Sequence, residues 1–186
     1  KPVYRKNRVP QHDTLRLLLN KYYEPFHRKL WKRSRRSDLF CGLDCHTMLD
    51  HAPAISEQPG EKRPFICLSN QGDAQGGKVH GRRLTCPPEM IRSLAQCLKE
   101  VFPKEEKIVL NDPFLGGYIV RKHSRNLPWI QIELNRRAYL EKSWFDRQNL
   151  AVCNRRIEFL RARFLSAIRE FVDRNYLEDY DGEDVA

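Results

Sequence analysis

The strongest constraint on the fold is a set of short apolar runs in which apolar and polar residues do not alternate. Three of them, at residues 40–46, 64–70 and 129–134, are too short for a stable helix and are bounded by loop residues. A shorter run, IVLND, occupies residues 108–112. Continuous apolar strands belong to sheets that are buried on both faces. The chain is therefore predicted to have an α/β fold with a mostly parallel or mixed central sheet.

Amphipathic segments alternate with these runs. Residues 12–36 and 144–176 place apolar side chains at helical spacing, and another helix is predicted from the prolines after Cys86 to Val101. The segment GGYIVRKHS (116–124) is predicted to be a strand whose entry needs glycine. Strands that alternate with helices indicate a sheet with helices on both faces.

The length of 186 residues favours one domain with a single core over two. No apolar run approaches the roughly 20 residues that cross a bilayer, so a membrane protein is not expected. The chain opens at Lys1 without an initiator methionine, which suggests that an N-terminal segment of the full protein is missing. Residues 177–186 are predicted to be a frayed acidic tail.

The six cysteines form no CxxC pair and no dense disulfide pattern. Reduced thiols and a cytoplasmic protein are therefore predicted. The oligomeric state does not follow from the sequence.

The formal net charge of +10 is concentrated near the N-terminus, where Lys1 to Arg36 contain twelve Lys and Arg residues against two acidic ones. A basic stretch with Trp31 among its arginines is typical of nucleic-acid binding, and equally of the solvated face of a helix. A basic surface also attracts small anionic substrates. A nucleic-acid-binding module is kept as an alternative, although nucleic acid is not the expected partner.

Chemically active side chains stand at the carboxyl ends of predicted strands. Asp44 and His46 lie at the end of the run at 40–46, Asn111 at the end of IVLND, and Glu133 near the end of the run at 129–134. Ligands of such sheets bind at the carboxyl ends of strands, so these groups are predicted to share one edge. An imidazole is a common zinc ligand, and a carboxylate near the metal can accept a proton from bound water. The alternative is structural: His46 forms a hydrogen bond at a strand end, and Glu133 pairs with an arginine.

Four blocks of the sequence stand in an order that is more specific than any one of them. They are GLDCHTM, FICLSNQGDAQGG, LNDPFLGGYIVRKH and WIQIELNRRAYLE, and they follow YYEPFH at residues 22–27. In this order they resemble the N-formylglutamate amidohydrolase family, over roughly residues 20–142. The resemblance implies a three-layer α/β/α fold of the zinc-carboxypeptidase-like phosphorylase/hydrolase type. It also implies zinc-dependent cleavage of an N-acyl group from an acidic amino acid such as N-formylglutamate.

The resemblance implies roles for individual residues. His46 would be a zinc ligand, Asp44 would orient it through a hydrogen bond, and Glu133 would be the general base. Arg121, or alternatively Arg136, would hold a substrate carboxylate through its planar fork.

Asn111 is a further candidate substrate contact, although its side chain also suits a turn before Pro113. A small N-acyl amino acid would be the partner.

The metal site implied by the resemblance is incomplete in this sequence. A catalytic zinc takes about three protein ligands plus water, and the family's earlier block with a histidine and an acidic ligand has no counterpart here. We therefore expect one Zn²⁺ per chain whose other ligands lie upstream of Lys1. The alternative is a metal-free, non-catalytic member of the same fold.

Overall fold

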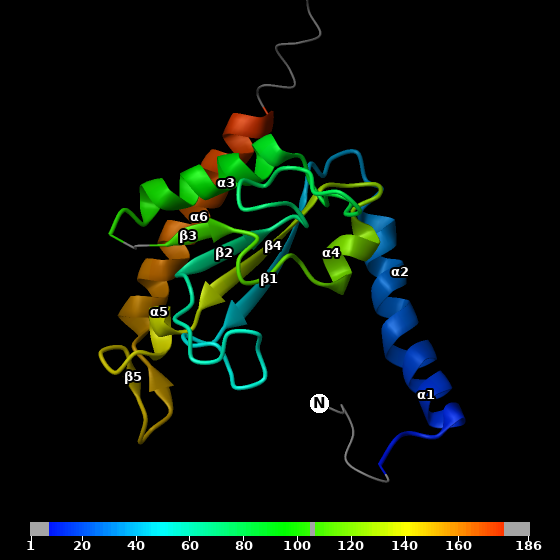
Figure 1. Ribbon diagram of the computed structural model, residues 1–186, viewed down its shortest axis with the longest axis horizontal. Coiled ribbons are helices and arrows are strands. Elements are labelled where there is room, and N and C mark those ends of the chain that lie inside the picture. The colour runs from blue at the N-terminus through cyan, green and yellow to red at the C-terminus, as the bar shows by residue number, and fades with distance from the viewer. Residues whose placement is uncertain (1–7, 105–106, 177–186) are drawn as a thin grey trace, which may run out of the picture. The chain divides into compact units, whose positions relative to one another are not determined.

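The computed structural model describes residues 8–104 and 107–176 (Figure 1). The chain divides into two compact units, residues up to 39 and residues from 40 onward. The predicted acidic tail at 177–186 lies outside the described residues. The sheet and its core lie in the second unit. That residues 1–186 form a single domain stays a prediction.

The first unit is helical, as its apolar spacing predicts. It consists of α1 (His12–Leu18), the π-helical turn η1 (Leu19–Tyr23) and α2 (Glu24–Arg33). Pro25 stands in the first turn of α2, where a missing N–H costs no hydrogen bond.

The second unit is built on a four-stranded mixed sheet, which confirms the predicted fold class. Its strands are β1 (Gly42–Met48), β2 (Ile66–Ser69), β3 (Ile108–Leu110) and β4 (Trp129–Asn135). Their order across the sheet is β1-β4-β2-β3. β1 runs parallel to β4 and β2 runs parallel to β3, whereas β2 and β4 are antiparallel.

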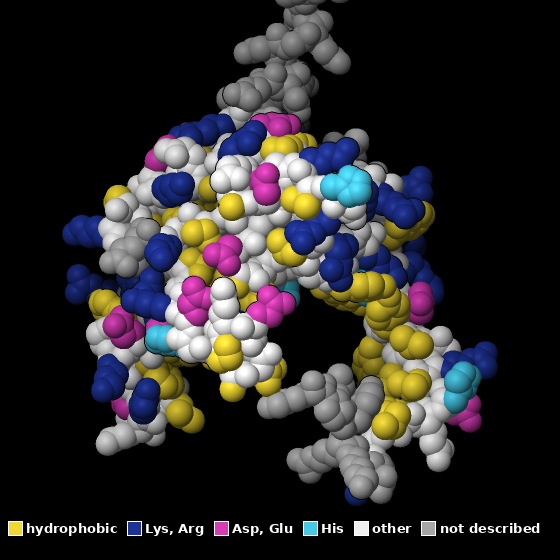
Figure 2. All heavy atoms as spheres, in the orientation of Figure 1, with side chains coloured by type: hydrophobic (Ala, Val, Ile, Leu, Met, Phe, Trp, Pro, Cys, Tyr) yellow, Lys and Arg dark blue, Asp and Glu magenta, His cyan; other side chains and the backbone are white. Residues whose placement is uncertain are grey.

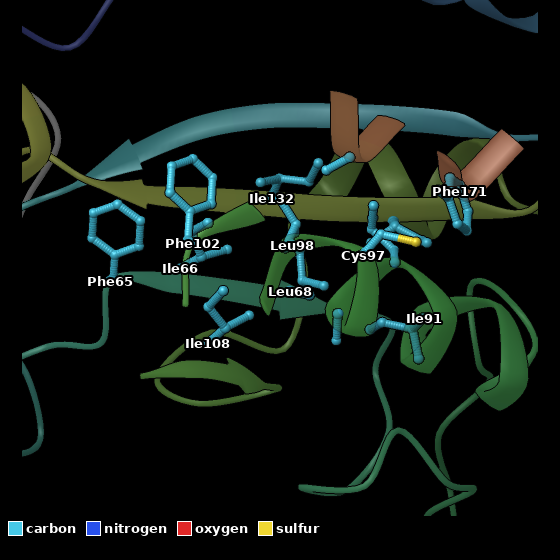
Figure 3. Packing of buried hydrophobic residues seen from close by; sticks show 14 of the residues in the cluster. Phe65, Ile66, Leu68, Ile91, Cys97, Leu98, Phe102, Ile108, Ile132 and Phe171 are labelled. Atoms are coloured by element: carbon cyan, nitrogen blue, oxygen red, sulfur yellow. The ribbon is translucent and has the colours of Figure 1, made fainter. Parts of the chain in front are cut away.

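Two long helices, α3 (Pro88–Val101) and α6 (Asn154–Tyr176), pack against each other and cover one face of this sheet. Figure 3 shows Ile66 and Ile132 on the strands, Leu98 on α3 and Phe171 on α6 in the same core. Each of these four side chains is at most 4% exposed, so the face under α3 and α6 is dry. The part of the chain that the structure describes contains no helix long and apolar enough to cross a membrane.

The strand predicted at 116–124 is wrong, because this segment contains the helix α4 (Tyr118–His123). The β-branched residues of YIVRKH favour a strand locally. A helix instead buries Val120 and His123, three residues apart, on one side.

The predicted helix at 144–176 starts ten residues later than expected, at Asn154. The residues ahead of it form a small hairpin of β5 (Phe145–Asp146) and β6 (Ala151–Val152). The carboxylate of Asp146 holds the turn of this hairpin, because it accepts the backbone N–H of Gln148 at 2.8 Å. The short helix α5 (Arg137–Leu140) directly follows β4.

Candidate active site

The face of the sheet opposite α3 and α6 carries polar side chains from three neighbouring strands. Residues that face each other across the strands form two rows, the first Asp44, Gln131 and Ser69, and the second His46, Glu133 and Cys67. Because side chains alternate along a strand, the two rows point to the same face. We call these six residues the polar face.

His46 and Asp44 form a pair at the β1 end of the polar face. The Nε2 atom of His46 lies 3.0 Å from Oδ1 of Asp44. The side chain of Asp44 is 13% exposed, whereas that of His46 is 46% exposed. The largely buried carboxylate therefore fixes the imidazole through one nitrogen, and the accessible ring keeps its other nitrogen for a ligand.

Glu133 lies on β4 in the middle of the polar face, and its side chain is buried. Burial raises the pKa of its carboxyl, because the charged form loses hydration. Three smaller effects lower the pKa of Glu133 without cancelling the rise. They are the electrostatic interaction with His46, the hydrogen bond from Gln131 and the charge of Arg63. A carboxylate whose pKa is shifted toward neutrality is suited to accepting and returning a proton.

Gln131 holds the carboxylate of Glu133 in place. Its Nε2 atom donates a hydrogen bond to Oε1 of Glu133 at 3.0 Å, and its Oε1 atom accepts the backbone N–H of Gly117. Gln131 thereby links the polar face to the loop before α4. Gln131 was not among the residues predicted for the site, although a polar side chain two positions before Glu133 in an apolar strand must share its face.

The loop at residues 112–117 crosses the polar face over β2. Ser69 donates from Oγ to the carbonyl of Phe114 at 2.7 Å, and Gln71 donates from Nε2 to the carbonyls of Leu115 and Gly116, both at 2.9 Å. Gly116 has a φ of 113°, which only glycine adopts readily. Gly116 thus shapes this loop, whereas the sequence predicted that it opens a strand.

The prediction that all candidate groups share one edge of the sheet is wrong. Because β2 is antiparallel to β4, the carboxyl ends of β2 and β3 point away from those of β1 and β4. Asn111, which follows β3, therefore lies away from the edge where His46 and Glu133 are found.

The side chain of Asn111 is fully used in holding a loop. Its Oδ1 atom accepts the backbone N–H of Asn70 at 2.9 Å, and its Nδ2 atom donates to Oδ1 of Asn70 at 2.9 Å and to the carbonyl of Asp73 at 2.7 Å. Its φ of 57° is in the left-handed region that asparagine tolerates. The geometry matches the turn-forming role that was the alternative to substrate contact.

The two candidate arginines lie in different places. Arg136 stands at the end of β4 and donates from Nε to Oγ1 of Thr47 at 3.1 Å, one residue beyond His46. Arg121 is exposed on α4, and its carbonyl accepts a hydrogen bond from Arg83 at 3.0 Å. The arginine whose charge lowers the pKa of Glu133 is instead Arg63.

A zinc site is not complete within the described residues. His46 and Asp44 offer an imidazole and a carboxylate of the kind that zinc binds. Among residues 8–104 and 107–176, however, no group of three or more His, Cys, Asp and Glu side chains is placed to hold a metal ion. The six cysteines, all in the described part, are free.

The family model described as N-formylglutamate amidohydrolase matches residues 1–140. A solved structure of N-formylglutamate amidohydrolase from Ralstonia eutropha JMP134 has the same fold, with a TM-score of 0.62 and 20% sequence identity. The match covers 90% of the present chain and 57% of that one. No curated protein matches the chain. The family match over three quarters of its length shows that the chain belongs to the N-formylglutamate amidohydrolase family.

Proposed function

We propose that this protein hydrolyses the N-acyl amide of an acidic amino acid such as N-formylglutamate. The observation that carries the proposal is the buried carboxyl of Glu133, whose pKa is raised by burial. Glu133 on β4 lies directly opposite His46 on β1, and His46 in turn contacts Asp44. Family membership supports the same reaction class. The direct test is release of formate and glutamate from N-formylglutamate by the full-length protein, with N-formyl-leucine as a comparison substrate.

In the proposed reaction Glu133 accepts a proton from a water molecule as the water oxygen attacks the acyl carbon. The C–N bond then breaks, and the same proton passes to the departing amine, so that the products are a carboxylic acid and an amino acid. Gln131 supports this role, because its hydrogen bond to Oε1 restrains the carboxylate and leaves the other oxygen for the proton. His46 is the exposed group on the adjacent strand.

We propose further that zinc takes part, with His46 as one ligand and Asp44 as the residue that orients it. A bound zinc would polarise the acyl oxygen and lower the pKa of a bound water. Its remaining ligands would come from residues outside those that the structure describes. A cytoplasmic location is part of the same proposal, since the free cysteines are compatible with a reducing compartment.

Replacing His46 tests the metal proposal without an activity assay. In the full-length protein we expect about one zinc per chain, and His46→Ala should reduce the bound zinc strongly, because a catalytic site has few protein ligands to lose. Elemental analysis of purified protein measures this. His80→Ala removes an exposed imidazole from a loop and should leave the zinc content unchanged. Equal zinc in the His46 variant and the wild type would rule out the ligand role.

The pH dependence of hydrolysis tests the raised pKa of Glu133. The carboxyl must be ionised to accept a proton, so kcat/KM should decrease when the pH drops below the pKa of Glu133. Because that pKa is raised, the decrease should begin at a higher pH than the usual glutamate pKa of about 4.3 would give. The hydrogen bond from Gln131 lowers this pKa, so Gln131→Met should move the acid limb to still higher pH. Gln96→Met, on the surface of α3, is the matched control. An acid limb that does not move in Gln131→Met would separate Glu133 from the observed titration.

The nucleic-acid alternative rests on the basic charge of the first unit. The polar face itself presents two carboxylates, from Asp44 and Glu133, which repel a phosphate backbone. Steeply salt-dependent binding of an oligonucleotide, without any hydrolysis of N-acyl amino acids, would favour that alternative.

A further inference from the structure

Arg63 has an unusual guanidinium group. The residue lies just before β2, where its backbone N–H donates to the carbonyl of Asp50 at 2.8 Å. Its Nε atom is buried, yet it has no hydrogen-bond partner among the described residues. A buried donor without a partner costs free energy, so such a group calls for an explanation, and a ligand that the donor binds is one.

The guanidinium of Arg63 lies against the ring of Phe114. Its Cζ atom lies 4.9 Å from the centroid of the Phe114 ring, within the range of a cation–π contact. The Phe114 carbonyl in turn accepts the hydrogen bond from Ser69 on the polar face. A planar guanidinium that stacks on a ring can still bind a carboxylate through its N–H groups in bidentate fashion.

The position of Arg63 relative to Glu133 suits a substrate-binding role. Its charge is felt by the Glu133 carboxyl. Cys67 pairs with Glu133 in the sheet, and both Cys67 and Ser69 contact the Phe114 carbonyl, so Phe114 and Arg63 lie on the β2 side of Glu133. His46 lies on the β1 side. A substrate at Glu133 would thus have His46 on one side and Arg63 on the other.

A cavity of about 470 Å³ adjoins Arg63 and Phe114. The acidic side chains of Glu57, Glu61 and Asp112 also line it, against the single further cation Lys62. Figure 2 shows Asp and Glu side chains around the loop at 49–64. These three acidic residues are exposed and their charges are screened by solvent, whereas the Arg63 Nε is buried. Arg63 is therefore the cation of this cavity that has a buried, unpartnered donor.

We propose that Arg63, rather than Arg121 or Arg136, binds a carboxylate of the N-acyl amino acid substrate. This inference rests on the proposed function of the same site. The unpartnered Nε and the cation–π contact with Phe114 distinguish Arg63 from Arg121, whose side chain is exposed, and from Arg136, whose Nε already bonds Thr47.

The experiment compares substitutions at the three arginines in the full-length protein. Arg63→Gln should raise KM for N-formylglutamate by roughly 10- to 100-fold with a smaller change in kcat, as expected for the loss of a charged bidentate contact. Arg63→Lys should recover little of this loss, because an ammonium group lacks the planar fork. Arg169→Gln removes an equal charge from the exposed surface of α6 and should leave KM unchanged.

A binding measurement keeps the test separate from catalysis. Calorimetric titration with glutarate, a dicarboxylate that cannot be hydrolysed, should show binding to the wild type and a weakening of roughly the same 10- to 100-fold in Arg63→Gln. Failure of the wild type to hydrolyse any N-acyl amino acid, with glutarate binding that still depends on Arg63, would overturn the proposed reaction and keep the carboxylate site.

Three results would overturn the assignment to Arg63. The first is wild-type KM and glutarate affinity in Arg63→Gln, and the second is a loss that appears in Arg121→Gln or Arg136→Gln instead. The third is a shift of the acid limb in Arg63→Gln with KM unchanged, which would show that Arg63 acts on the pKa of Glu133 alone. Thermal melting of each variant, together with the charge-retaining Arg63→Lys, separates these results from a failure to fold.

Discussion

Glu133→Gln is expected to lower kcat for N-formylglutamate by roughly two to four orders of magnitude, the usual size of general-base catalysis. Glutamine keeps the shape of the side chain and the Oε1 atom that accepts the hydrogen bond from Gln131, but it cannot take a proton. Zinc content should not change, since Glu133 is proposed to move a proton and not to bind the metal. Steady-state kinetics and elemental analysis of the same preparation measure both quantities.

Stability separates this prediction from the structural alternative, in which Glu133 only pairs with a cation. Burial raises the pKa of Glu133 in the folded protein, so ionisation near neutral pH opposes folding, and that cost appears as pH rises through the unfolded pKa toward the folded one. Glu133→Gln removes this cost, so the melting temperature at neutral pH should be unchanged or higher. A lower melting temperature with turnover per folded molecule intact would instead identify an ion pair. Glu141→Gln, at an exposed position after α5, is the matched control.

Phe171→Ala is expected to destabilise the protein by about 3–5 kcal/mol, the range for removing a fully buried aromatic ring. Phe171 on α6 is 0% exposed, and its ring centroid lies 5.2 Å from that of Phe40, just ahead of β1. The prediction matters for function because α6 begins after residue 140, where the family match ends, yet it covers the sheet that carries Glu133. Urea denaturation followed by far-UV circular dichroism measures the change.

Leu165→Ala provides the comparison on the same helix. Leu165 is 45% exposed, so its replacement should cost less than about 1 kcal/mol. Equal effects of the two substitutions would mean that α6 is not anchored to the sheet through Phe171.

Local sequence pattern determined the strands of this protein and part of its site. The apolar run at 129–134 became β4, and the run at 40–46 became most of β1, because burial of continuous apolar side chains is decided within each segment. The alternation of side chains along a strand also determined that Asp44 shares a face with His46. These statements need no knowledge of what lies next to the strand.

Tertiary structure decided which strands are neighbours, and with that the composition of the site. The pairing of β4 with parallel β1 and antiparallel β2 places Glu133 between His46 and Cys67 and moves Asn111 to another part of the sheet. No local pattern contains strand direction, because the same apolar run can pair in either sense.

Contacts between residues that are far apart in the sequence could likewise not be predicted from local sequence patterns. Arg63 contacts Phe114 and acts on Glu133 only because two loops and β4 converge at the polar face. Similarly, YIVRKH became α4, which buries Val120 and His123, although its β-branched residues favour a strand locally. Local propensity determined most of the strands and long helices of this protein, whereas strand pairing and burial in the tertiary structure determined where they lie and which side chains share the site.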